Sequence, residues 1–188
     1  MPERRPPIEA FGQSLAELTA AIAARGGPPP VERWDPPHCG HSGMRIARDG
    51  TWYHEDRPIQ RQAMVRLFAT VLRREPDGSH VLVTPVEKLT IDVETTAFRA
   101  TQMTMAGEGE GRRIGVTLDS GDGFVIGPDN PLYVVAAEHG PSPRIAVRFG
   151  LEAELARPLY YELADIALAE GHNPVGVWSD GAFFRLEP

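Results

Sequence analysis

The chain of 188 residues has little of several features that would narrow its function. Its single cysteine, Cys39, excludes a disulfide within the chain. Its single lysine, Lys88, means that arginine supplies nearly all of the positive charge. No hydrophobic run approaches the ~18 residues of a membrane span, and no signal-peptide pattern opens the chain. We therefore expect a cytoplasmic protein without membrane insertion.

Complete catalytic signatures are also missing. Gly40-His41-Ser42-Gly43 lacks the glycine spacing of a nucleophile elbow. The glycine-rich stretch 107–113 carries two glutamates and leads into a predicted strand, unlike a phosphate-cradling loop, which opens onto a helix. This stretch is typical of a hairpin loop, although its Arg112 and Arg113 could still hold a phosphate. The sequence therefore favours a protein that is not an enzyme and needs no cofactor.

What the chain does contain is ordinary for a globular protein, with 41% hydrophobic and 24% charged residues. The formal net charge of −7 argues against general nucleic-acid binding, which calls for a basic surface. An anion site would have to be built from arginine, whose planar guanidinium can bind phosphate or carboxylate through two hydrogen bonds.

Apolar spacing predicts three helices. The first covers residues 8–22, where Ile8, Phe11, Leu15, Leu18 and Ile22 form one stripe that ends at the Gly-Pro run 26–30. We interpret it as packed on the first lobe. A second helix follows Pro58, with Met64, Leu67, Phe68, Val71 and Leu72 on its apolar side. A third begins near Pro158 and stops at Gly171.

The remaining segments predict short strands and turns. Residues 31–43 indicate an ordered loop, and 44–54 a hairpin. Alternating residues and turn signals predict the other strands at 80–84, 86–93, 98–105, 114–118, 124–126, 132–136, 144–149, 175–178 and 182–186. Many strands with few helices favour the α+β class over a wound parallel sheet. We predict an N-terminal helix in 1–29, an α+β lobe in 30–92 and a β-rich lobe in 93–188 that ends in a helix and a hairpin.

Two stretches of the sequence resemble each other. Residues 46–53 and 177–184 each combine an apolar approach, a polar residue, Asp-Gly, a small residue and two aromatics. Asp-Gly between apolar runs indicates a tight hairpin turn, since both residues accept positive φ at little cost. Because each hairpin lies near a helix, the pair predicts two related lobes. A groove between two lobes is a common place for a small ligand.

Several motifs together resemble the bacterial family called domain of unknown function 1285. They are Cys39-Gly40, the segment 45–52, Pro58-Ile59, the segment 83–88 and the segment 177–181. The resemblance runs from about Trp34 to the C-terminus. It implies a duplicated α+β core whose second half resembles a pleckstrin-homology-like barrel. It also implies a site for a nucleotide-like ligand between the halves and a role in signal transduction, but no catalytic residues.

Six residues are our candidates for a ligand site in the groove between the lobes: Arg45, Arg48, Trp52, Arg61, Lys88 and Trp178. The cations would hold a small anionic molecule and the two indoles would stack on its ring. The alternative is that these residues have a purely structural role: both tryptophans would be core anchors, and the cations would pair with neighbouring carboxylates.

Two other functions stay open. Cys39 and His41 could serve a hydrolase, with or without a metal that His38, His54, Glu55 or Asp56 would help to bind. Adjacent ligands at 38 and 39 and the lack of a Cys-x-x-Cys pair argue against the metal. The protein could instead be an interaction module that offers the N-terminal helix or a strand edge to a protein partner.

Overall fold

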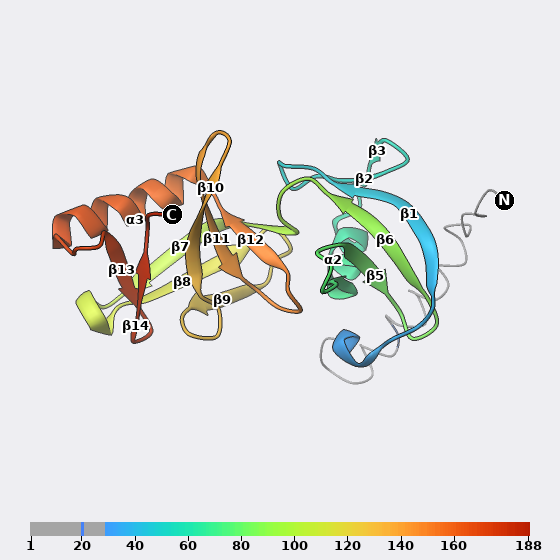
Figure 1. The fold of residues 1–188 in the computed structure, drawn as a ribbon, viewed down its shortest axis with the longest axis horizontal. Coiled ribbons are helices and arrows are strands. Elements are labelled where there is room, and N and C mark those ends of the chain that lie inside the picture. The colour runs from blue at the N-terminus through green and yellow to red at the C-terminus, as the bar shows by residue number, and fades with distance from the viewer. Residues whose placement is uncertain (1–19, 21–28) are drawn as a thin grey trace. The chain divides into compact units, whose positions relative to one another are not determined.

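The structure is a computed structural model that describes residue 20 and residues 29–188. The predicted N-terminal helix over 8–22 and its packing therefore fall, apart from residue 20, outside the described residues. The chain divides between Thr95 and Thr96 into two compact units (Figure 1). In the described part, no helix has the length and apolar character needed to cross a membrane.

The first unit is built on one six-stranded sheet. A short 3-10 turn, η1 (Val31–Arg33), precedes it. Its strands are β1 (His38–Ile46), β2 (Trp52–His54), β3 (Arg57–Pro58), β4 (Leu72–Arg74), β5 (His80–Val83) and β6 (Lys88–Val93). They lie in the order β3-β2-β1-β6-β5-β4, and only the central pair, β1 and β6, is parallel. Helix α2 (Gln62–Thr70) connects β3 to β4.

The second unit holds another six-stranded sheet. Its strands are β7 (Phe98–Ala106), β8 (Arg113–Leu118), β9 (Gly123–Ile126), β10 (Leu132–Ala137), β11 (Gly140–Ala146) and β12 (Glu152–Leu155). They lie in the order β10-β11-β12-β7-β8-β9, with β7 and β12 parallel. The 3-10 turn η2 (Gly109–Gly111) joins β7 to β8. Helix α3 (Arg157–Glu170) follows β12, and a separate hairpin of β13 (Gly176–Ser179) and β14 (Ala182–Arg185) ends the chain.

The two sheets have the same topology. In each, the first and last strands pair in parallel at the centre, and a three-strand meander extends outward on either side (Figure 1). The protein is therefore α+β with two related β-rich lobes, each of which carries a helix, as the sequence predicted. The helices differ in position: α2 lies between the third and fourth strands, whereas α3 follows the sixth. An open sheet followed by a helix makes the second lobe consistent with a pleckstrin-homology-like fold.

The two Asp-Gly hairpins are not equivalent parts of this duplication. Asp180-Gly181 forms a two-residue turn with φ of 50° and 75°, but its hairpin lies outside the six-stranded sheet. Asp49-Gly50 instead belongs to the five-residue loop 47–51 between β1 and β2, where only Gly50 has positive φ, 88°. The hairpin of the second lobe that corresponds to β1–β2 is the β7–β8 hairpin at 107–112. The prediction of two related lobes is confirmed, but the pairing of the two hairpins is wrong.

Several element boundaries also differ from the sequence predictions. The segment 31–43 is not all loop, because β1 starts at His38. Gly40 and Gly43 have φ of 105° and 73°, and the β1–β6 register shifts there. These irregularities break the alternation that would reveal a strand. Helix α2 starts four residues after Pro58, which lies in β3. Strand β12 was not predicted, and β11 begins before residue 144.

Each sheet buries one row of side chains in a core. On β6, Leu89 and Ile91 are buried, while the alternate positions point to the opposite face. From α2, Phe68 packs on the same core, where its ring stacks on Trp52 with a centroid separation of 6.2 Å. The polar face of β1 and β6 is thereby left for a site.

Candidate functional site

The face of β1 and β6 that points away from the core carries a row of polar pairs. They join His38 to Thr90 (2.8 Å), His41 to Asp92 (3.4 Å) and Arg45 to Glu94 (2.7 Å). Parallel strands present successive side chains of one face side by side, so a pair forms at about every second residue. The row follows from the β1–β6 pairing.

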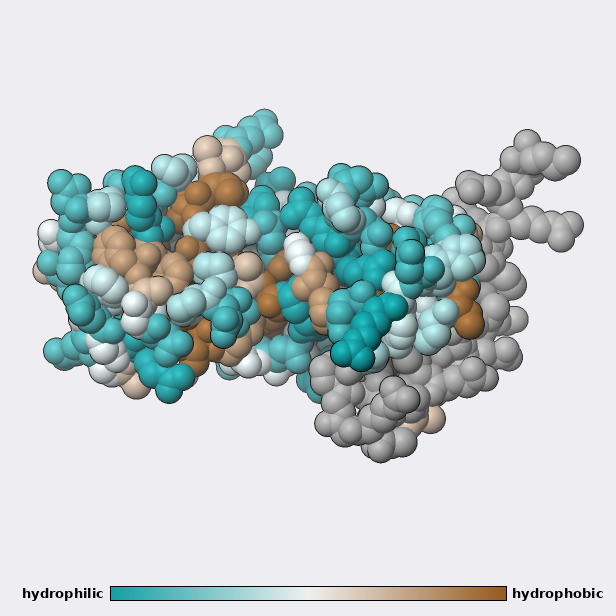
Figure 2. Space-filling view, turned by 60° about the horizontal axis from the view of Figure 1, so that its bottom comes forward, coloured by the Kyte–Doolittle hydropathy of each residue, from teal (hydrophilic) through white to brown (hydrophobic). Residues whose placement is uncertain are grey.

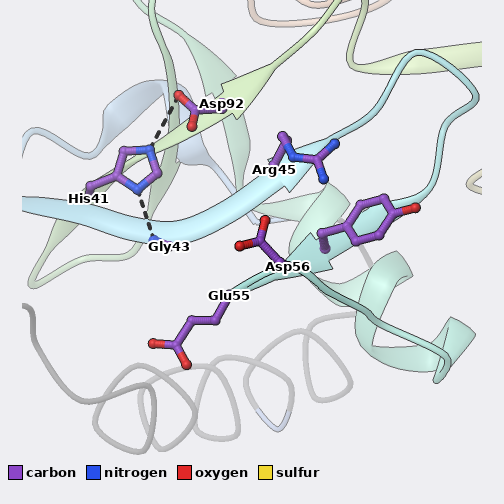
Figure 3. A pocket seen from close by; sticks show the side chains of 7 residues that line it. His41, Gly43, Arg45, Glu55, Asp56 and Asp92 are labelled. Carbon is purple, nitrogen blue, oxygen red and sulfur yellow. Dashed lines mark hydrogen bonds and ion pairs between the residues drawn. The ribbon is translucent and has the colours of Figure 1, made fainter.

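A cavity of about 350 Å³ opens on this row, within the first unit. Its lining residues are His41, Gly43 and Arg45 of β1, Tyr53 of β2, Asp92 of β6, and Glu55 and Asp56 of the turn between β2 and β3 (Figure 3). Strand β1 forms the floor. The β2–β3 turn lies on one side of it and β6 on the other, as the strand order requires.

Arg45 is held in a fixed position at one end of the cavity. The register sets it level with Tyr53 on one side and Asp92 on the other. Its guanidinium carbon lies 4.3 Å from the centre of the Tyr53 ring, a cation–π distance. Nη1 donates to Glu94 Oε1 at 2.7 Å. No other polar partner of this guanidinium occurs in the described part, so its Nε and Nη2 groups can donate to a ligand.

Glu94 connects Arg45 to the β1–β2 hairpin. Its other oxygen accepts the backbone N–H of Arg48 at 2.9 Å. The pKa of Glu94 lies below its usual value, first because of that backbone hydrogen bond and then because of Arg45. Glu94 therefore stays ionised and keeps Arg45 in place.

His41 has a defined tautomer at the other end of the cavity. Its Nδ1 accepts the backbone N–H of Gly43 at 2.9 Å, so the proton of the neutral ring is on Nε2, which faces Asp92 (Figure 3). This contact is available because the bulged backbone turns the Gly43 N–H toward the ring. His41 thus offers a donor at Nε2.

The β2–β3 turn places two carboxylates beside the cavity. Glu55 and Asp56 have φ of 47° and 64°, a conformation that costs ~1–2 kcal/mol per residue for side chains other than glycine. The Glu55 N–H donates to the Gly43 carbonyl at 3.0 Å, which ties the turn to β1. The same two positive φ values define the favoured two-residue hairpin turn. Glu-Asp is an uncommon sequence for it, so the turn gave little signal.

The cavity has acceptors along its sides and donors on its floor. The carboxylates are Glu55, Asp56 and Asp92, whereas the donors are Arg45 and His41. It can hold a small polar molecule that both accepts and donates hydrogen bonds. Of the lining residues, only Arg45 was among our six candidates, because nothing in the sequence shows which outward side chains of three strands become neighbours.

The candidate residues of the β1–β2 hairpin have different surroundings. Arg45 lines the cavity, and Arg48 is exposed in the adjoining loop, near the same Glu94. Trp52 is only 4% exposed and stacks on Phe68, so the structure places it in the core. Its indole is covered by protein.

The other three candidates lie apart from this cavity. Arg61 is the exposed N-cap residue of α2. Lys88, at the far end of β6, pairs with Glu75 at 3.4 Å and Asp35 at 3.7 Å. Four residues separate it from Asp92, which is ~13 Å along a strand. Trp178 belongs to the second unit, where it packs edge-on against Phe183.

The Cys39–His41 pair has no catalytic geometry in the described residues. Cys39 Sγ donates to the Pro37 carbonyl at 3.4 Å, while the His41 nitrogens face Gly43 and Asp92. Within the described part there is also no group of three or more histidine, cysteine, aspartate or glutamate side chains arranged to hold a metal ion. The geometry lends the hydrolase alternative no support.

Arg112 and Arg113 of the glycine-rich stretch are both engaged by carboxylates. Arg112 is buried and makes two hydrogen bonds to Glu170, and Arg113 Nε lies 3.3 Å from Asp180. These contacts attach α3 and the β13–β14 turn to the second sheet. They are structural contacts.

Two family models together match residues 29–186. Residues 29–96 match the N-terminal domain of the domain of unknown function DUF1285, and residues 97–186 match the C-terminal domain of the protein of unknown function DUF1285. The chain therefore belongs to the DUF1285 family, as the sequence motifs indicated. No curated protein matches it.

Two solved structures are similar to this chain. A DUF1285 family protein from Silicibacter pomeroyi DSS-3 is 42% identical, with a TM-score of 0.79 over 86% of this chain and 88% of that one. A DUF1285 family protein from Shewanella baltica OS155 is 21% identical, with a TM-score of 0.52 over 65% of this chain and 90% of that one. The second comparison shows the fold alone.

Proposed function

We propose that this protein binds a small anionic, nucleotide-like molecule and acts as a regulator in signal transduction in the cytoplasm. The observation that supports this proposal is the fixed position of the Arg45 side chain. Its guanidinium is held by Glu94 and Tyr53 at the edge of a cavity, with N–H groups left for a ligand. A donor fixed before binding loses little side-chain entropy when the ligand arrives, which favours affinity.

The cavity suits binding better than turnover. Its volume of about 350 Å³ lies in the range of small-molecule sites. His41 and Arg45 are paired with Asp92 and Glu94. The described residues that line the cavity include no serine, threonine or cysteine that could act as a nucleophile. Arg48, in the adjoining hairpin loop, is a second candidate cation for the same ligand. A ligand site in the groove between the lobes, with Arg61, Lys88 and Trp178 as contacts, stays a prediction.

The test is calorimetric titration with AMP, GMP, CMP and UMP, together with thermal unfolding. A ligand that binds only the folded protein raises its melting temperature by mass action. Arg45→Gln should weaken binding by about 10- to 100-fold, since a hydrogen bond to a charged group contributes ~1.5–3 kcal/mol. Arg66→Gln, an exposed arginine of α2 outside the cavity, is the matched control.

The result that would contradict the proposal is clear. If none of the four nucleotides binds or raises the melting temperature at millimolar concentration, the protein is not a nucleotide-like ligand binder. Equal losses in Arg45→Gln and Arg66→Gln would contradict the location of the site instead.

A further inference from the structure

We infer that the cavity takes the amino-bearing base of a nucleotide, and that the phosphate lies at the Arg45 end, toward the β1–β2 hairpin. The inference rests on the proposed function and adds the ligand's orientation and the chemistry of its base. It follows from how charge is distributed around and along β1.

Carboxylates flank the floor of the cavity on both sides. Asp92 lies on β6 at one side, and Asp56, with Glu55, lies on the β2–β3 turn at the other (Figure 3). Ionised carboxylates only accept hydrogen bonds, so they require N–H or O–H groups on the ligand. A phosphate placed between them would meet negative charge on both sides. The middle of the cavity therefore selects the part of the ligand that carries donors.

Between these sides, the floor offers a donor. His41 Nε2 carries the proton because Nδ1 is occupied by the Gly43 N–H. A ring group that combines an exocyclic amino group with a neighbouring acceptor matches this arrangement. The amino group would donate to Asp92 or Asp56, and the acceptor would face His41. Adenine, guanine and cytosine each have such an edge, and the two hydrogens of the amino group can donate to both carboxylates. Uracil and hypoxanthine have a carbonyl beside a single ring N–H, which can donate to one carboxylate only.

Among the described residues that line the cavity, the one arginine lies at the opposite end of the floor from His41. Arg45 is four residues beyond His41, ~13 Å along a regular strand and less across the bulge. Arg48 is exposed in the adjoining hairpin loop, where its backbone N–H donates to the same Glu94. At the hairpin end a phosphate would meet the Arg45 guanidinium, which uses Nη1 for Glu94 and has Nε and Nη2 left to donate. The spacing is of the order of the length of a nucleoside monophosphate.

Paired ligands test the chemistry of the base. GMP differs from IMP by one amino group, and CMP differs from UMP by an amino group in place of a carbonyl. We expect GMP and CMP each to bind at least ~10-fold more tightly than the partner that lacks the amino group. IMP and UMP that bind as tightly as GMP and CMP would overturn the inference.

Paired variants test the orientation, with each nucleotide compared with its own nucleoside. Asp92→Asn should weaken the binding of guanosine and of GMP by the same factor, because Asp92 would contact the base. Arg45→Gln should weaken the binding of GMP but leave the binding of guanosine unchanged, because Arg45 would contact the phosphate. Asp92 is 67% exposed at its side chain, so its replacement leaves the fold intact. Asp165→Asn, at an exposed position of α3, is the control.

The outcomes separate the two proposals. A uniform loss across nucleosides and nucleotides in Arg45→Gln, with no loss in Asp92→Asn, would overturn the orientation and leave nucleotide binding standing. Absence of binding by every nucleoside and nucleotide would overturn both.

Discussion

The ion pair between Arg112 and Glu170 gives the sharpest stability prediction. Arg112 follows η2, and its side chain is 7% exposed, whereas that of Glu170, at the end of α3, is 24% exposed. Nη1 donates to Oε2 at 3.2 Å, and Nη2 donates to Oε1. Two parallel hydrogen bonds between a guanidinium and a carboxylate form the strongest ion-pair geometry in proteins.

The two partners should not be equally costly to remove. Glu170→Gln leaves the nearly buried Arg112 charge without a counter-ion, and we expect a loss of ~3 kcal/mol in the free energy of unfolding. Arg112→Met leaves Glu170 still in contact with water, so we expect a smaller loss of ~2 kcal/mol in the free energy of unfolding. Arg113→Met removes the neighbouring arginine, whose pair with Asp180 is exposed at both ends, and should cost less than ~1 kcal/mol.

Urea unfolding followed by fluorescence and by circular dichroism measures these differences. The substitutions should destabilise the second unit, Thr96–Pro188, in which all of these residues lie. The pKa of Glu170 is lowered, chiefly by its hydrogen bond from Arg112. The pair's stabilisation is therefore complete above the ordinary glutamate pKa, about 4.3, and is lost as pH falls through the lowered value. Equal small losses in Arg112→Met and Arg113→Met, or a smaller loss in Glu170→Gln than in Arg112→Met, would refute this reasoning.

Three further predictions concern single side chains. Trp52→Ala should cost ~3–5 kcal/mol in unfolding free energy, because the indole fills the core of the first unit; a loss below ~1 kcal/mol would show that it is not a core anchor. Gly176→Ala should destabilise by ~1–3 kcal/mol, since the new Cβ would lie 2.6 Å from a ring carbon of the facing strand, whereas Gly111→Ala, with open space, should stay within ~0.5 kcal/mol in the same denaturation assay. In NMR titrations, Arg45→Gln should raise the pKa of Glu94 only part of the way to its usual value, because a backbone N–H makes the larger contribution; a complete return would contradict this order.

Sequence signals were sufficient to place a helix or strand where a residue's conformation depends on its neighbours in sequence. Pro158 and Gly171 bound α3 closely, and alternating residues located β5, β6 and β8 within two residues. The same reasoning failed at β1, where two glycines with positive φ interrupt the alternation. It also failed at the start of α2, since Pro58 is as compatible with an edge strand as with the first turn of a helix.

The site shows the limit of such reasoning more clearly. Arg45 was chosen as a ligand contact because it flanks the first hairpin, and it lines the cavity. The carboxylates beside it come from a turn and from Asp92, which is 47 residues away in sequence. Trp52, which was chosen for stacking on a ligand, stacks on Phe68 instead. An aromatic residue beside a turn has the same sequence pattern whether its ring meets a ligand or the core.

By itself, the sequence determined the class of the fold, because composition and alternation are local properties. Its motifs, through their resemblance to DUF1285, also indicated the family and a duplicated core. Only the tertiary structure decided that the relation lies in the order of the strands rather than in the two Asp-Gly hairpins. It also decided that His41, Arg45 and Asp92 become neighbours. The parallel pairing of the first and last strands of a sheet joins distant segments, and its register is set by packing of the buried face, which sequence spacing does not encode.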